Sequence, residues 1–213
     1  MIRDDQDEKL RGALVALVTP ATDDHEVDAE KLRENIRFAI EGGICKGTGI
    51  LLVAGGRGEG YFLDKDQYKA VVDEMADQAR SDVVTAAGVF ELSTKHAIER
   101  IRYAEERGID FIQCALPHYL RPSDEEVFTH YKMISDAVKE IGIFIYHTWW
   151  AMPMGLLNQS RQGYELSLPL TEKLANLRNI VGFKWSSPHF HHAVNGVVKI
   201  RDKCTILDNM GLA

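Results

Sequence analysis

The chain has 213 residues, of which 45% are hydrophobic and 27% charged, a composition typical of a folded globular domain and unlike that of a disordered or fibrous chain. Its 25 Lys and Arg against 32 Asp and Glu give a net charge of −7 without any basic block. This balance argues against nucleic acid or an anionic membrane as the main partner, because both are bound through clustered basic residues. Small solutes are therefore the expected ligands.

The ends and the apolar runs of the chain indicate where the protein works. The longest apolar runs, Ala13–Val18 and Ile50–Ala54, fall far short of the roughly 20 residues that span a bilayer. Residues 1–11 are charged and polar, lack the apolar core of a signal peptide, and are expected to form a frayed tail before a single domain over residues 12–213. We therefore expect a cytoplasmic protein. Its cysteines, odd in number and without C-x-x-C spacing, are expected to be reduced and mostly buried: Cys45, Cys114 and Cys204.

Short apolar runs alternate with amphipathic helical stretches, at intervals close to one βα unit of about 30 residues. The helices expected from caps and apolar spacing include Asp28–Glu41, with Leu32, Ile36, Phe38, Ala39 and Ile40 inward, one from Ser93 or Thr94 to Arg107, and Asp124–Lys139, with Val127, Met133, Ile134, Ala137 and Val138 inward. The runs that predict strands are Ala13–Val18, Ile50–Ala54, Val83–Val89, Phe111–Leu116, Ile143–Tyr146, Ile180–Lys184 and Thr205–Leu207.

Two architectures satisfy this pattern: an open doubly wound sheet and a closed (β/α)8 barrel. Glycines and polar or aromatic residues collect just after each strand, for example at Thr19–Pro20 and Gly55–Glu59. In a parallel barrel these strand ends meet around one mouth, where such enzymes place their chemistry. We therefore predict a TIM-barrel type fold, incomplete, with about seven βα units.

The segment Gly55–Gly60 follows a strand and precedes a helix, but it has neither the G-x-G-x-x-G spacing of a dinucleotide site nor the P-loop motif. Its backbone N–H groups could converge on an anion such as a carboxylate, and a tight turn that needs positive φ explains the glycines equally well. An open sheet that binds a nucleotide is disfavoured by the failed spacing.

Lys184 and Tyr146 end neighbouring predicted strands. A lysine pointing into a barrel would be desolvated, which favours the neutral amine and makes it a nucleophile able to form a Schiff base, although a solvated charge at the rim is the commoner situation. A phenol beside it could relay a proton, or could simply pack.

Other candidates stand at the same strand ends. Tyr119, His118 and His147 follow predicted strands, and either histidine could act as an acid or a base near neutral pH. Trp149-Trp150 opens a long loop of the kind that often controls specificity. The group His189, His191 and His192 resembles a metal cluster, but it lacks a carboxylate pattern and is interpreted as a solvated helix start, so no metal is expected.

Five segments in this order and spacing resemble the dihydrodipicolinate synthase and N-acetylneuraminate lyase family of class I aldolases. They are Gly12–Pro20 (GALVALVTP), Gly55–Glu59 (GGRGE), Pro117–Ser123 (PHYLRPS), Ile145-Tyr146 and Asn179–Lys184 (NIVGFK). The resemblance implies a barrel in which Lys184 forms a Schiff base with pyruvate or a related 2-oxo acid, with no metal or organic cofactor. It further implies that Tyr146 shuttles protons and that Tyr119 reaches across a dimer interface, within a homodimer or homotetramer.

The same resemblance implies that Gly55, Gly56 and Arg57 bind the 2-oxo acid carboxylate through backbone amides. Gly56 and Arg57 replace both threonines of the family's G-T-T-G-E, so the hydroxyl that links two tyrosines in synthases is missing. His118 replaces the first tyrosine of P-Y-Y, and His147 and Trp149 lie where synthases carry N-V-P-x-R-T. We therefore expect a lyase or aldolase other than dihydrodipicolinate synthase, with a larger or more aromatic aldehyde shaped by Arg57, Trp149 and Trp150.

Three alternatives stay open: a sugar-acid dehydratase using the same lysine, a non-catalytic binding relative, and an inactive fragment. The last arises because a complete barrel takes about 250 residues, so a chain ending at Ala213 is expected to be truncated or completed by another chain.

Overall fold

The computed structural model describes residues 9–79, 81–117, 122–147, 165–187 and 189–208. Within them, seven parallel strands form one sheet in chain order, each paired with the next. The strands are β1 (Ala13–Ala16), β2 (Gly49–Val53), β3 (Val84–Val89), β4 (Phe111–Ala115), β5 (Gly142–Tyr146), β6 (Ile180–Trp185) and β7 (Thr205–Asp208).

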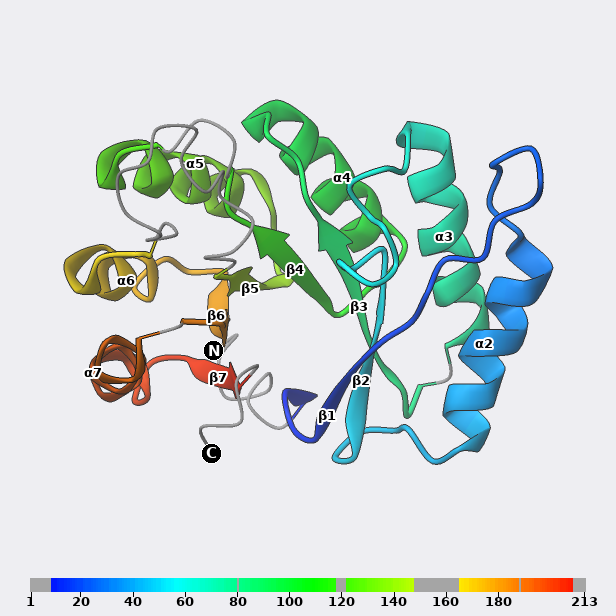
Figure 1. Ribbon diagram of the computed structural model, residues 1–213, viewed down its shortest axis with the longest axis horizontal. Coiled ribbons are helices and arrows are strands. Elements are labelled where there is room, and N and C mark those ends of the chain that lie inside the picture. Colours follow the sequence, from blue (N-terminus) through cyan, green and yellow to red (C-terminus); the bar gives the residue numbers. More distant parts are fainter. Residues whose placement is uncertain (1–8, 80, 118–121, 148–164, 188, 209–213) are drawn as a thin grey trace.

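Six helices in the described part of the chain lie around the outside of the curved sheet (Figure 1). They are α2 (Ala29–Glu41), α3 (Lys65–Gln78), α4 (Thr94–Glu106), α5 (Asp124–Ala137), α6 (Leu168–Leu174) and α7 (Phe190–Ile200). Five begin at an Asp or Ser whose side chain accepts a backbone N–H of the first turn, which satisfies donors that a helix start leaves unpaired. None of these helices is long and apolar enough to cross a bilayer.

The alternation of side chains along each strand divides the core in two. One cluster packs between the sheet and the helices and includes Leu51, Ile112 and Phe183. The other fills the inside of the barrel with Ile50, Leu52, Val84, Phe111, Phe144 and Val181. Residues that share the inward parity near the strand ends therefore face one another across the barrel.

The predicted fold class is confirmed: seven parallel strands with outer helices form an incomplete (β/α) barrel, with β1 and β7 as its two edges. All seven predicted strands are present, and each end lies within two residues of its expected position. The cysteines are free, with Cys114 and Cys204 buried and Cys45 partly exposed.

Three packing expectations were wrong. Phe38 is 81% exposed and Met133 is 50% exposed, because each lies two residues after a buried member of its helix stripe and so turns to solvent. The expected tail also ends earlier than Arg11. Leu10 is 5% exposed and packs in the barrel cluster, while Lys9 Nζ lies 2.7 Å from Asp110 Oδ1, so these two residues belong to the folded domain.

His130 predicts a loss of stability in acid. It is 5% exposed in α5 and its Nδ1 lies 2.8 Å from Thr94 Oγ1, and burial lowers its pKa to about 4. Above pH 6.5 the ring is neutral in both states. As pH falls from 6.5 to 4, His130 binds a proton in the unfolded chain but stays neutral in the folded chain. This difference lowers the free energy of unfolding by up to about 3 kcal/mol.

Urea unfolding at a series of pH values measures this effect. We expect His130→Gln to flatten the decline between pH 6.5 and 4, and His191→Gln, at an exposed position of α7, to leave it unchanged. Buried His147 contributes over the same pH range, so the decline should become shallower in His130→Gln without disappearing, and equal slopes in both variants would show that His130 does not contribute.

Candidate active site

Lys184 and Tyr146 are brought together at the carboxyl ends of two neighbouring strands. Their Cα atoms are register partners between β5 and β6, and both lie at positions of inward parity, in line with Phe144 and Gly182. The Nζ of Lys184 lies over the face of the Tyr146 ring, 4.3 Å from its centroid. The amine is thus held against the phenol at the mouth of the barrel.

The protonation of Lys184 is set by burial. Desolvation lowers the pKa of its ammonium below the ordinary value, because a charged group loses hydration when apolar neighbours surround it. The side chain of Gln113 on β4 provides a polar contact, with Oε1 at 3.5 Å from Nζ, the outer limit of a hydrogen bond. A lysine in this environment carries more neutral amine at a given pH than one in water.

The pKa of Tyr146 shifts in the opposite direction from that of Lys184. Burial raises the pKa of its phenol, and two neighbours oppose this shift: a hydrogen bond with the side chain of Ser186 and the positive charge of Arg57. The ring also meets the edge of Phe90, with centroids 6.3 Å apart. The phenol therefore keeps its proton at neutral pH and has a hydroxyl neighbour to exchange it with.

The segment Gly55–Gly60 forms a compact turn beside these residues. Ala54 and Glu59 have left-handed backbone conformations, with φ of 49° and 53°, and Gly60 N donates to Gly55 O at 3.1 Å. No described residue accepts a hydrogen bond from the N–H of Gly56 or Arg57. The turn therefore offers two unpaired backbone donors of the kind that bind an anion.

Close packing against β3 fixes the position of this turn. A Cβ on Gly88 would lie 2.1 Å from the carbonyl oxygen of Ala54, so only glycine allows the two backbones to approach. Thr19 adds a hydrogen bond of 2.7 Å from its Oγ1 to Gly58 O. β3 and the segment after β1 thus hold the turn in place.

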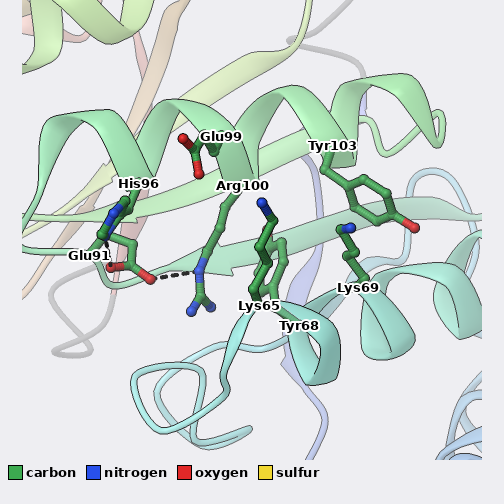
Figure 2. A pocket seen from close by; sticks show the side chains of 8 residues that line it. All are labelled: Lys65, Tyr68, Lys69, Glu91, His96, Glu99, Arg100 and Tyr103. Carbon is green, nitrogen blue, oxygen red and sulfur yellow. Dashed lines mark ion pairs between the residues drawn. The ribbon is translucent and has the colours of Figure 1, made fainter.

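A separate cavity of about 330 Å³ lies on the outer side, between α3 and α4 (Figure 2). Arg100 crosses it, pairing through Nε with Glu91 Oε1 at 2.6 Å and donating from Nη2 to Leu63 O, also at 2.6 Å. Arg100 therefore ties the segment after the glycine turn to α4. The cavity is lined by Lys65, Tyr68, Lys69, Glu91, His96, Glu99, Arg100 and Tyr103, and Lys184 is not among its lining residues.

His147 faces the other way. It is fully buried, its Nε2 accepts a hydrogen bond from Leu166 N at 3.1 Å, and its ring lies 5.3 Å from that of Trp185 in the core cluster beneath the helices. Burial lowers its pKa to about 4, so it is neutral at neutral pH. These contacts position the chain after β5, and a contact of His147 with substrate stays a prediction.

The remaining predicted site residues either lie outside the described residues or lie near the start of α7. Tyr119, His118 and Trp149 lie outside the described residues, so their roles stay predictions. His189 precedes α7, as expected for a helix start, and its Nδ1 lies 2.6 Å from Glu165 Oε2. Within the described part of the chain, no group of three or more His, Cys, Asp or Glu side chains could hold a metal ion.

Three neighbours of the site are not among the predicted site residues: Gln113, and Ser186 and Phe90, which the sequence places only among the residues that follow the strands. Gln113 is the one amide in the apolar run of β4. Strand parity places it on the inward face, the same face as Lys184, so the sequence contained a signal for this contact. Ser186 supplies a hydroxyl to Tyr146 from the end of β6, although the threonines expected near that phenol are replaced.

Comparison with known proteins identifies the family. The profile of the Dihydrodipicolinate synthetase family matches residues 9–210. The chain belongs to this family. It is 33% identical over 180 residues to a 4-hydroxy-tetrahydrodipicolinate synthase of Methanothermobacter thermautotrophicus, covering 84% of this chain and 58% of that protein.

Solved structures of the same family share the fold. The dihydrodipicolinate synthase of Aquifex aeolicus superposes with a TM-score of 0.80 at 28% identity, covering 92% of this chain and 62% of that one. A chloride-inhibited dihydrodipicolinate synthase of Acinetobacter baumannii, complexed with pyruvate, gives a TM-score of 0.79 at 28% identity, with the same coverage. The chain thus spans about three fifths of the length of the relatives it matches.

The environment of Lys184 predicts an unusual titration. Because burial lowers the pKa of its ammonium, Lys184 should become reactive toward an acylating reagent at lower pH than an exposed lysine such as Lys95. Competitive labelling over a pH series, read by peptide mass spectrometry, measures both residues in one sample. Parallel titration of the two would contradict the burial described here.

Proposed function

We propose that the chain acts as a Schiff-base-forming lyase or aldolase on pyruvate or a related 2-oxo acid. The observation that carries this proposal is the partly buried amine of Lys184 held over the ring of Tyr146, at the strand ends of a barrel of the dihydrodipicolinate synthetase family. The pyruvate complex of the Acinetobacter baumannii relative supports the choice of ligand.

The first step uses the neutral amine. The nitrogen lone pair of Lys184 attacks C2 of the 2-oxo acid, the carbonyl π pair moves to oxygen, and a proton passes from nitrogen to that oxygen to give a carbinolamine. A second proton on the oxygen lets it leave as water while nitrogen forms the double bond to C2. The resulting iminium withdraws electrons from C3, so a C3 proton can be lost or a C3–C4 bond can break.

Tyr146 suits the proton transfers of these steps. Its phenol is protonated at neutral pH, lies beside the amine and has Ser186 and Arg57 as neighbours. The donors on Gly56 and Arg57 would bind the carboxylate of the 2-oxo acid, on a turn whose Gly55 lies close to the Gln113 amide.

We further propose that the second substrate is not that of a dihydrodipicolinate synthase. Gly56 and Arg57 replace the two threonines of the family turn, and His147, Trp149 and Trp150 stand where the motif with a carboxylate-binding arginine is expected. A larger or more aromatic aldehyde is the proposed partner. Tyr119, if the chain assembles as a dimer or tetramer, would complete the proton relay from a neighbouring copy.

Borohydride trapping tests the Schiff base directly. Incubation with pyruvate and borohydride should add one reduced pyruvyl group to Lys184. The Lys184→Ala variant should gain none, and Tyr146→Phe should be trapped about 10²-fold or more slowly, the range for losing a general acid-base group. Lys69→Ala, which changes a lysine of the outer cavity, serves as the control. An unmodified wild-type chain would favour a non-catalytic binding relative.

Substrate preference tests the role proposed for Trp149. Trp149→Ala should change the ratio of kcat/KM values for aromatic and aliphatic aldehydes while borohydride trapping with pyruvate stays near the wild-type rate. Equal loss of trapping and of aldehyde turnover would show that Trp149 supports the whole site and does not select the second substrate.

A further inference from the structure

Gln113 is a polar residue in the interior of the barrel that nothing in the fold requires. It lies in the middle of β4, is fully buried, and faces inward between Phe111 and Ala115. Its register partners are Gly88 on β3 and Phe144 on β5, neither of which offers a polar side chain. A buried amide without partners is costly, so its position calls for hydrogen-bonding groups nearby.

The oxygen of the Gln113 amide has a polar neighbour, whereas its nitrogen has none among the described residues. The Oε1 of Gln113 lies 3.5 Å from Lys184 Nζ, whereas Nε2 has no acceptor among the described residues. An unpaired buried donor destabilises a protein by about 1–3 kcal/mol. The amide thus faces the reactive nitrogen and carries a free N–H donor within the same site.

The free donor lies close to the glycine turn. A Cβ added to Gly55 would lie 2.8 Å from Leu52 Cδ2 and 3.9 Å from Gln113 Nε2, so the backbone of the turn passes close to the amide. The N–H groups of Gly56 and Arg57 belong to the same turn. An anionic ligand held by this turn would meet Nε2 on one side and Lys184 Nζ on another.

We propose that Gln113 is a catalytic residue of this chain, which orients the Lys184 amine through Oε1 and donates from Nε2 to an oxygen of the bound 2-oxo acid. This inference rests on the proposed function. An amide suits both tasks because it accepts from the amine and donates to the ligand without adding a charge that would hold the lysine protonated.

Two variants of nearly equal shape separate this role from a structural one. Gln113→Met removes both hydrogen bonds and also the unpaired donor. The pyruvate concentration for half-maximal borohydride trapping should therefore rise about tenfold or more, while the midpoint of thermal unfolding stays the same or rises. A residue needed only for packing would give the opposite pattern, with lower stability and unchanged trapping.

Gln113→Glu provides the second measurement. A carboxylate beside Lys184 stabilises the ammonium, so the midpoint of the pH dependence of trapping should move to higher pH by about one unit or more, whereas Gln113→Met should not move it upward. Thr85→Val, which removes a buried polar group from β3 that hydrogen-bonds to Asp110, is the matched control and should leave unchanged both the pyruvate concentration for half-maximal trapping and the pH midpoint of trapping.

The outcomes are distinct. A wild-type chain that pyruvate and borohydride do not modify would overturn the Schiff-base proposal and this inference together. A wild-type chain that is modified, with Gln113→Met trapped at the same pyruvate concentration and Gln113→Glu at the same pH, would overturn the role of Gln113 alone.

Discussion

Removal of one lysine from water is the constraint on which the candidate active site depends. An ammonium group loses hydration as apolar neighbours enclose it, and the described surroundings of Lys184 lower its pKa through burial, with no carboxylate holding the charge. The contacts that do exist are an aromatic face and an amide oxygen. Both can accommodate a neutral amine, which is the form that attacks a carbonyl carbon.

The barrel makes this environment through strand parity. Because side chains alternate along each strand, Tyr146 and Lys184 face inward while the residues that follow them, His147 and Trp185, pack toward the helices. The reactive pair and its supporting layer are therefore consecutive in sequence but lie on opposite sides of the sheet. The glycine turn packs against β3 at a distance that Gly88 permits, because a glycine there lets the two backbones approach.

The seven strands and their order could be predicted from the sequence, because each strand is a continuous apolar run bounded by a helix or glycine signal. It also located Lys184, Tyr146 and the glycine turn, since all three stand at strand ends that a barrel brings together. His147 stands at the same strand end as Tyr146, but parity turns its ring toward the helices, so its contact with substrate stays a prediction. Phe38 and Met133 are apolar, so the sequence predicts them to be buried. Both lie on the solvent side of their helices.

What sequence reasoning could not supply is the set of contacts that depends on register between distant strands. Gln113 meets Lys184 across 71 positions of sequence, and Ser186 meets Tyr146 from the neighbouring strand end. Neither contact follows from a motif. Both depend on how far each strand slides past the next, which the irregularity between Ile143 and Phe144 shifts locally.

The most direct test of the central claim is a crystal structure of the chain soaked with pyruvate. We expect continuous electron density from Lys184 Nζ to C2 of the ligand, with the carboxylate on the N–H groups of Gly56 and Arg57 and the Tyr146 hydroxyl within hydrogen-bonding distance of the adduct. Pyruvate bound elsewhere, or a free Lys184 amine turned out into solvent beside it, would contradict a Schiff base at Lys184.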